Sequence, residues 1–329
     1  MKRSMNTSKL IAFDLEGPLS PQDNAYEVMG LAERGYELFE RLSRYDDILT
    51  LEQRPDYEPG DTLYLIIPFL IADGINEEDI LKVSKKAGLT PGAKETIKTL
   101  KEKGFQIVII STSYEPHARH IGSRLGISEE FIACTPLWHL GADNYLLSPH
   151  ERELIISEKK KILNIHLDDD ERLKKELDRF YLEKLPSLEI YKDIKKIKVV
   201  GGRRKVEALR KFMERFNAQP SETVCIGDSI TDFRMLDYIN KGGGLAIVFN
   251  GNEYSLPYGT VGVASDTLEA VIPVIENFYK YGYEGLKNIN PVPYHAEYSL
   301  ICEAEDMDSL IAIHKLMRKK IRGRAAQLG

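Results

Sequence analysis

IAFDLEGPLS, residues 11–20, is the stretch that decides the fold of this chain. Its apolar beginning is typical of a buried β-strand, yet the run ends in Asp14, and Glu16 follows two residues later. Carboxylates at the end of a buried strand are costly unless a metal ion or a cationic side chain neutralises them. The stretch therefore predicts that partners for these acids lie elsewhere in the sequence.

Three further apolar runs have the same character: FQIVII (105–110), ETVCIG (222–227) and GLAIVF (244–249). Patterns with helical spacing separate the runs, over 91–104, 205–217 and 267–282. Continuous apolar runs of this length are typical of parallel strands covered on both faces. The alternation predicts an α/β fold, a Rossmann-like parallel sheet with helices on both faces.

Polar residues stand at the ends of three of these runs: Asp14, Ser111 and Asp228. In parallel sheets, ligands bind beyond the carboxyl ends of the strands, so these side chains are expected to converge. Asp232 follows Asp228 by four residues, and together with Asp14 and Glu16 it completes a cluster of oxygen ligands without His or Cys. Such a set suits Mg²⁺, which binds a few carboxylates and keeps waters and substrate phosphate.

Two further features suit phosphate. The hydroxyls of Ser111 and Thr112, with backbone N–H groups ahead of a helix, match phosphate oxygens. Lys205 begins the helix before the third strand, and its charge could neutralise both an attacking carboxylate and the phosphate. The candidate site is therefore one for phosphate chemistry with a divalent cation.

These motifs carry a resemblance. D-x-E-G-P after the first strand, S-T-S after the second, Lys205 on a helix and G-D-S-I-T-D after the third resemble the four ordered motifs of haloacid dehalogenase-like phosphohydrolases. The D-x-E opening is similar to that of the phosphoserine phosphatase-like branch. The phrases at 89–113 and 244–257 also resemble segments of that family, so the resemblance covers about half of the chain.

The resemblance implies a domain organisation. The catalytic core would consist of 1–20, 90–138 and 199–284, with a mainly helical cap at 21–89 inserted after the first strand. A second insert of unknown role, 139–198, and a helical C-terminal extension, 285–329, lie outside it.

The resemblance also implies roles at the metal and the reacting phosphorus. Asp14 would be the nucleophile that forms an aspartyl-phosphate. Asp14, Asp228 and the backbone carbonyl of Glu16 would bind Mg²⁺, with Asp232 supporting the metal or its waters. The side chain of Glu16 would protonate the leaving oxygen and then activate water.

Substrate contacts follow from the same resemblance. Ser111 and Lys205 would hold the transferring phosphoryl group, next to Thr112 and Gly17. Asp23, just after the first motif, would suit an amine on the substrate, although a helix N-cap explains it as well. The expected activity is a Mg²⁺-dependent phosphatase acting on a small phosphorylated metabolite.

Alternatives remain open at this stage. The phosphatases of this family usually have Asp where this chain has Glu16, so a phosphotransferase, or a slow ligand-binding or regulatory protein, is also compatible with the motifs. A receiver-like phosphoacceptor also combines acids, a hydroxyl and a lysine, but its motif order differs. His117 and His120 are better explained as surface or substrate-proximal residues than as metal ligands.

Composition bounds the partners. The net charge is −6, and no basic domain or stripe stands out. The nearest to one, RKKIRGR at 318–324, is best interpreted as a solvated helix end, so no nucleic acid is expected. The longest apolar stretch, 63–72, is too short for a membrane crossing.

Three scattered cysteines predict buried, reduced thiols and a cytoplasmic protein. The tail helix, 307–327, could pack on the core or on a second subunit, so a homodimer is possible.

Overall fold

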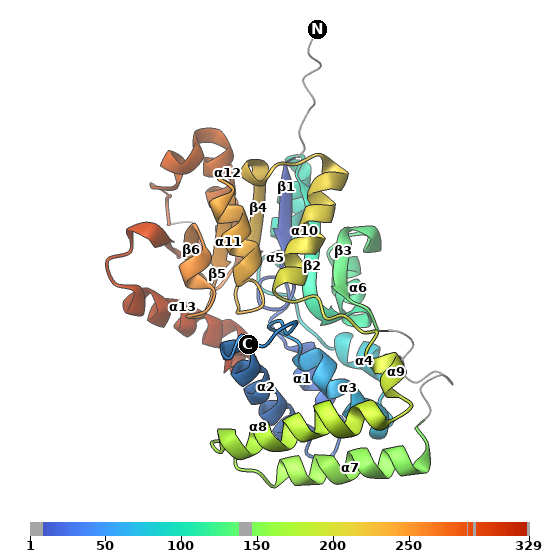
Figure 1. Cartoon of the computed structure of the whole chain (residues 1–329). Helices are drawn as coiled ribbons and strands as arrows, with labels where there is room; N and C mark the ends of the chain where they lie inside the picture. The colour runs from blue at the N-terminus through green and yellow to red at the C-terminus, as the bar shows by residue number, and fades with distance from the viewer. Residues whose placement is uncertain (1–8, 138–146, 288, 292–293, 328–329) are drawn as a thin grey trace.

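The computed structural model describes residues 9–137, 147–287, 289–291 and 294–327. Its centre is a seven-stranded sheet with the strand order β3-β2-β1-β4-β5-β6-β7 (Figure 1). The first six strands are parallel, and the last pairs antiparallel with its neighbour. Their bounds are β1 Leu10–Phe13, β2 Gln106–Tyr114, β3 Ile132–Thr135, β4 Thr223–Gly227, β5 Leu245–Phe249, β6 Val261–Ala264 and β7 Glu297–Leu300.

The register of the central strands brings the predicted motifs to one edge. Phe13 of β1 lies opposite Ile109 of β2 and Ile226 of β4, so these three strands run in step. The chain leaves β1 for β2 on one side and reaches β4 on the other, and this change of direction opens a crevice at the carboxyl ends. Asp14 and Asp228 therefore emerge side by side.

The four predicted strands are all present, with one correction. The second strand continues to Tyr114, so Ser111 and Thr112 lie inside β2 rather than after it. The sequence reasoning missed β3, β6 and β7. Each has four residues, as β1 does, but includes polar residues or glycine where β1 is apolar throughout, so these short runs cannot be separated from loops.

Helices cover both faces of the sheet, because alternate residues of each strand point to opposite sides. Ile11 and Phe13 share a buried cluster with α5 (Ala93–Glu102), α6 (Glu115–Arg124) and α12 (Val271–Tyr281). Leu10 and Ala12 share another with α10 (Arg203–Phe216), α11 (Phe233–Lys241) and α13 (Met307–Arg322). The prediction of a two-faced α/β sheet is confirmed.

The remaining helices form a cap beyond the carboxyl edge of the sheet (Figure 1). Their bounds are α1 Asn24–Met29, α2 Gly35–Leu51, α3 Thr62–Ala72, α4 Glu77–Ser84, α7 Pro149–Leu163, α8 Asp170–Arg179 and α9 Tyr191–Ile194, with a π-helical turn over Phe180–Lys184. The first four come from the predicted cap and the others from the second insert. Both groups contribute to one buried hydrophobic cluster.

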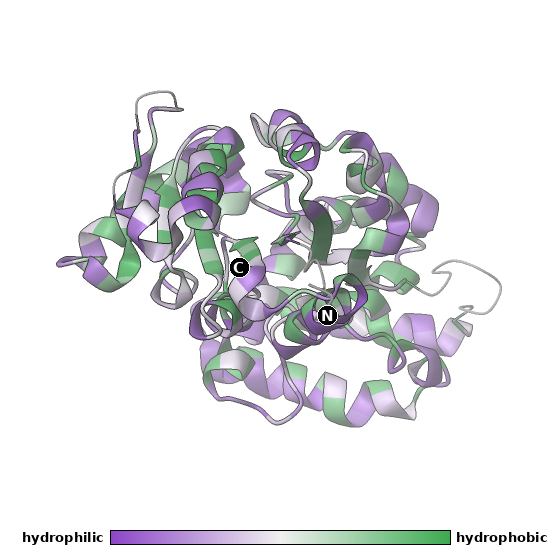
Figure 2. Ribbon diagram, turned by 90° about the horizontal axis from the view of Figure 1, so that it is seen from above, coloured by the Kyte–Doolittle hydropathy of each residue, from purple (hydrophilic) through white to green (hydrophobic). Residues whose placement is uncertain are grey.

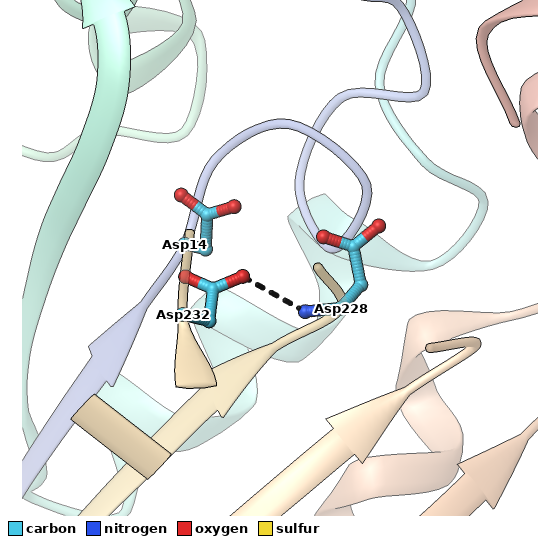
Figure 3. Close-up of side chains that lie close together, drawn as sticks. All are labelled: Asp14, Asp228 and Asp232. Carbon is cyan, nitrogen blue, oxygen red and sulfur yellow. Dashed lines mark hydrogen bonds between the residues drawn. The ribbon is translucent and has the colours of Figure 1, made fainter. Parts of the chain in front are cut away.

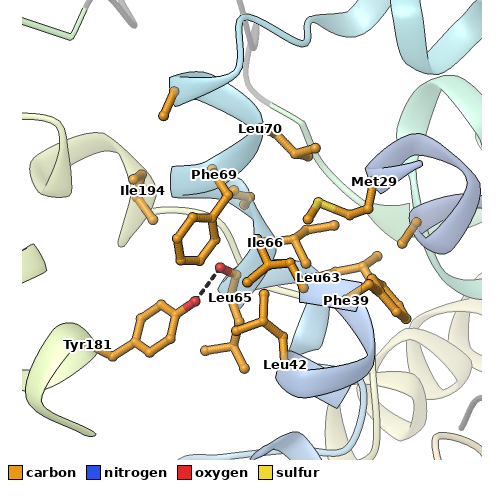
Figure 4. Close-up of a cluster of buried hydrophobic side chains, with 14 of the residues drawn as sticks. Met29, Phe39, Leu42, Leu63, Leu65, Ile66, Phe69, Leu70, Tyr181 and Ile194 are labelled. Carbon is orange, nitrogen blue, oxygen red and sulfur yellow. Dashed lines mark hydrogen bonds between the residues drawn. The ribbon is translucent and has the colours of Figure 1, made fainter. Parts of the chain in front are cut away.

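Figure 4 shows how the second insert packs on the cap. Tyr181 and Ile194 of the insert point toward α3, where Leu65 and Phe69 are buried. The Tyr181 hydroxyl donates a hydrogen bond to the Leu65 carbonyl. The second insert, whose role the sequence left open, therefore completes the hydrophobic core of the cap.

Surface polarity follows the layers. Seen from above (Figure 2), hydrophilic residues colour much of the peripheral helices, whereas the strands at the centre are hydrophobic. Of the helices in the described segments, none combines the length and the apolar character needed to cross a lipid bilayer.

All three cysteines are free, and Cys302 is exposed, so the expectation of buried thiols holds for Cys225 but is wrong for Cys302.

Candidate active site

Three carboxylates converge at the edge of the sheet (Figure 3). Asp14 follows β1, Asp228 follows β4, and Asp232 precedes the first residue of α11. One carboxylate oxygen from each lies within 4.8 Å of the others, and all three residues are buried. Chain segments that lie more than two hundred residues apart thus concentrate negative charge in one place.

Lys205 bridges two of these acids. Its Nζ lies 2.7 Å from Oδ1 of Asp14 and 2.7 Å from Oδ1 of Asp232, and the lysine is fully buried. Although burial alone lowers the pKa of a lysine, the two carboxylates raise it well above its usual range. Oδ2 of Asp232 accepts from the backbone N–H groups of Asp228 and Ser229, at 3.0 and 3.2 Å, so Asp232 is fully occupied as a supporting group.

The residues present fit a divalent cation. Oδ1 of Asp228 is buried and has no hydrogen-bond partner among the described residues, which is costly for a carboxylate oxygen. Burial, and next the charge of Asp232, raise the pKa of Asp14 to about 7. The cluster therefore leaves one buried carboxylate oxygen, Oδ1 of Asp228, open to a cation. Hard oxygen donors of this kind suit Mg²⁺.

Glu16 is held beside the cluster. Its Oε1 accepts from Ser113 Oγ at 2.7 Å and from the Asn24 backbone N–H at 3.1 Å. Burial, and next the charge of Asp23, raise the pKa of Glu16 to about 8. The predicted proton donor is thus protonated at neutral pH.

His117 lies nearby, with Nε2 3.9 Å from Oε1 of Glu16. It is fully buried, and burial lowers its pKa to about 3, so the ring is neutral at pH 7. Neither ring nitrogen has a hydrogen-bond partner among the described residues. Of the two alternatives that the sequence left open for His117, a surface residue or one near the substrate, the structure favours the second. Among the described residues, His117 belongs to no group that could hold a metal ion.

A cavity of about 70 Å³ lies above the acids, between the sheet and the cap. From the core it is lined by Asp14, Glu16, Ser111 and Thr112, four predicted site residues. The hydroxyl of Thr112 is buried without a partner, and that of Ser111 accepts from the Ser113 N–H at 3.0 Å. From the cap side the lining residues are Asp23, Phe39, Ser43, Asp46, Gly60, Thr62 and Leu63.

The glycine after the first motif has a steric reason. Gly17 has a φ of +108°, a region that L-residues rarely adopt. A Cβ atom at this position would collide with the carboxylate of Asp228. Gly17 therefore lets the loop after β1 approach Asp228, but Gly17 does not line the cavity in the described structure.

The interpretation of the basic run at 318–324 as a solvated helix end holds for Lys319, Lys320 and Arg324, which are exposed, but is wrong for Arg318 and Arg322. Arg318 and Arg322 do not point into solvent; both side chains are buried. Arg318 Nη1 donates to the Asp228 carbonyl at 3.0 Å and to its Oδ2, and Arg322 Nη1 donates to the same Oδ2 at 2.8 Å. The four-residue spacing of the two arginines was the only signal, since it places them on one face of a helix.

Two ion pairs join the cap to the helix that carries Lys205. Glu58, almost fully buried, accepts from Arg203, and Asp61 accepts from Arg204 at 2.6 Å. Because both arginines directly precede Lys205, the cap loop fixes the beginning of α10. Nothing in the sequence indicated this pairing, because it depends on a contact across more than one hundred and forty residues.

Comparison with known families decides the classification. Two family models match the chain, both described as haloacid dehalogenase-like hydrolases, one over residues 8–136 and the other over 143–248. The chain belongs to the haloacid dehalogenase-like hydrolases. The predicted family is confirmed, and with it the prediction that this haloacid dehalogenase-like protein is an enzyme of the hydrolase class.

Solved structures agree with this assignment. A gene product from Archaeoglobus fulgidus is 30% identical to this chain and superposes on it with a TM-score of 0.87. The match covers 98% of this chain and 99% of the Archaeoglobus protein. A phospho-aspartyl intermediate analogue of phosphoserine phosphatase is 18% identical and covers 82% of this chain and 100% of its own, with a TM-score of 0.53.

A substrate-bound phosphoserine phosphatase complex, 17% identical, covers 82% of this chain and 99% of its own, also with a TM-score of 0.53. At these identities the two phosphatases show a shared fold. No curated protein matches the sequence.

Proposed function

We propose that this hydrolase is a Mg²⁺-dependent phosphatase that acts on a small phosphorylated metabolite through an aspartyl-phosphate on Asp14. One observation carries the proposal: Lys205 lies 2.7 Å from both Asp14 and Asp232, while Asp228 offers an unpartnered oxygen within the same cluster. A buried carboxylate placed between a lysine and a cation position is suited to attack phosphorus.

In the first step, a carboxylate oxygen of Asp14 forms a bond to the phosphorus of the ester. The bond from phosphorus to the leaving oxygen breaks, and that oxygen takes the proton of the Glu16 carboxyl. Ser111 and Thr112 line the cavity on the β2 side, where their polar groups would bind the phosphoryl oxygens. Lys205 would offset the charge that accumulates on those oxygens.

In the second step, a water attacks the phosphorus of the aspartyl-phosphate. Glu16, now a carboxylate, removes the proton of that water, and the bond between phosphorus and Asp14 breaks. Inorganic phosphate and the original Asp14 carboxylate result. The hydrogen bonds from Ser113 and Asn24 keep Glu16 in place for both transfers.

Mg²⁺ would be held by Asp14, Asp228 and the Glu16 backbone carbonyl, with Asp232 in support, and when bound it supplies Lewis-acid stabilisation of phosphoryl charge. The cap supplies the other half of the cavity, and its closure excludes bulk water. A cavity of about 70 Å³ implies that the cap opens to admit substrate. Asp23 remains a proposed substrate contact, although it also caps α1 through the Tyr26 N–H.

The test is hydrolysis of p-nitrophenyl phosphate with MgCl2. The wild type should release phosphate, and Asp14→Asn should lower the rate at least a thousandfold, because the nucleophile is lost. Asp168→Asn is the matched control, since that carboxylate is exposed and distant in the sequence from the motifs. Addition of EDTA should abolish activity, and MgCl2 should restore it. Equal rates for the wild type and Asp14→Asn would overturn the proposal.

The same assay addresses the alternatives. If an added alcohol receives the phosphoryl group faster than water does, the protein is a phosphotransferase that uses the same aspartyl-phosphate. If Glu16→Asp is active and the wild type is not, the protein is a slow binding or regulatory member of the family. A cytoplasmic location and a homodimer remain predictions, which fractionation and analytical ultracentrifugation would test.

A further inference from the structure

Helix α13 lies outside both segments that match the family models, yet its last residue, Arg322, lines the cavity above the acids. We propose that Arg322 is a substrate-binding, specificity-determining residue whose guanidinium binds an anionic group on the leaving-group part of the phosphate ester. The inference rests on the proposed phosphatase function and deepens it. It assigns a substrate class, phosphate monoesters with a second negative charge.

The guanidinium of Arg322 is fixed from two sides. Nη1 donates to Oδ2 of Asp228 at 2.8 Å, and Nε donates to the Pro21 carbonyl at 3.2 Å. Among the described residues, no hydrogen bond uses Nη2. Arg322 also lines the cavity above the acids. A held cation with an unused donor at a cavity wall is suited to bind an anion.

Its neighbours place Arg322 on the leaving-group side. It lines the cavity together with Glu16 and Asp23, and it donates to the carbonyl of Pro21, in the loop between those two acids. Glu16 is the group that would protonate the leaving oxygen. Lys205, by contrast, contacts Asp14 and Asp232. The two cations therefore serve different parts of a substrate: the lysine the transferring phosphoryl, the arginine the group attached to the leaving oxygen.

Arg318 keeps Asp228 available for the metal. Both arginines bind Oδ2 of Asp228, whereas Oδ1 has no hydrogen-bond partner in the described structure. Oδ1 can thus face a cation while Arg318, which also binds the Asp228 carbonyl, retains Oδ2. Arg322 would keep its contact with Oδ2 as well, and its Nη2 donor would remain for a substrate anion.

The segment after α13 secures this position against the cap. Arg324 Nη2 lies 2.8 Å from Oε1 of Glu40 on α2, and its guanidinium lies 5.4 Å from the ring centre of Tyr26 on α1. The chain therefore runs from a core contact at Asp228 to a cap contact at Glu40. Arg322 is held between the core and the cap, where the leaving group of a bound ester would lie.

The experiment compares two esters of similar size, phosphoglycolate and 2-hydroxyethyl phosphate, which differ in having a carboxylate or a hydroxymethyl group. Their Kd values are measured by isothermal titration calorimetry with saturating MgCl2. The full chain carries Asp14→Asn to prevent turnover, alone or combined with Arg322→Gln or Arg322→Lys. The ratio of the two Kd values reports selectivity and cancels changes in metal binding that affect both esters alike.

With Arg322 intact, phosphoglycolate should bind about tenfold to a hundredfold more tightly than 2-hydroxyethyl phosphate, which lacks the carboxylate. Arg322→Gln should bring the ratio close to one, and Arg322→Lys, which keeps the charge, should retain part of it. An unchanged ratio in Arg322→Gln, or no preference with Arg322 intact, overturns the inference. Failure of the proposed function is seen separately, as wild-type protein that does not hydrolyse p-nitrophenyl phosphate.

Discussion

Replacement of Lys205 by methionine should leave two buried carboxylates without their cation. The Nζ atom lies 2.7 Å from Asp14 and 2.7 Å from Asp232, and the three side chains are at most 5% exposed. Removal of one partner from a buried ion pair costs about 3–5 kcal/mol, because the remaining charge stays desolvated. Methionine has a similar shape, so little of this loss comes from a cavity.

The loss can be expressed as a melting temperature. An unfolding entropy of about 2.1 cal/mol/K per residue, over a chain of 329 residues, converts 3–5 kcal/mol into a decrease of about 4–7 °C. The assay is thermal unfolding followed by circular dichroism at pH 8 with EDTA, so that added metal cannot replace the missing charge. Activity toward p-nitrophenyl phosphate should fall at least a hundredfold in the same variant.

Lys103→Met is the matched control. Its Nζ also lies 2.7 Å from a carboxylate, that of Glu276, but the two side chains are 46% and 42% exposed. Because water screens such a pair, the melting temperature should not change measurably. The reasoning is refuted if Lys205→Met has the same melting temperature as the wild type, or if both variants lower the melting temperature equally. Either result would mean that burial does not determine the strength of the Lys205 contacts.

Two further predictions concern the cap. Burial raises the pKa of Asp46 to about 7, above an unfolded value of about 3.9, so the stability that its protonated form contributes is lost as pH rises toward 7. The melting temperature of Asp46→Asn should therefore gain a few degrees relative to the wild type between pH 5 and pH 8. A difference in melting temperature that stays constant over this range contradicts the assignment. Phe69→Ala should cost about 3–5 kcal/mol, since Phe69 is fully buried 5.4 Å from the Phe180 ring. Amide exchange should accelerate in α7 and α8, whereas the exposed control Leu31→Ala should leave it unchanged.

The sequence by itself determined the sheet centre and most of the site. Three apolar runs, each ending in a polar residue, predict parallel strands whose ends meet, and the structure brings Asp14 and Asp228 together as this requires. Lys205 was recognisable because it lies at the beginning of the helix before β4. Such features are local, since strand period and helix spacing are properties of neighbouring residues.

Only the tertiary structure decided the role of the basic run. In the sequence, Arg318 and Arg322 stand among other cations on a charged helix, and a solvated surface explains them equally well. Their burial depends on the docking of α13 against the loop after β4, which brings Asp228 within hydrogen-bond distance. No local pattern encodes that contact, because its partners are ninety residues apart.

The second insert and the cap illustrate the same limit. Each has amphipathic or apolar helices, but the pattern does not tell which other element an apolar face will cover. Packing joined them into one cluster, in which Tyr181 of the insert contacts α3 of the cap. Helix and strand positions follow from local spacing, whereas the pairing of faces is set by shape and burial over the whole chain.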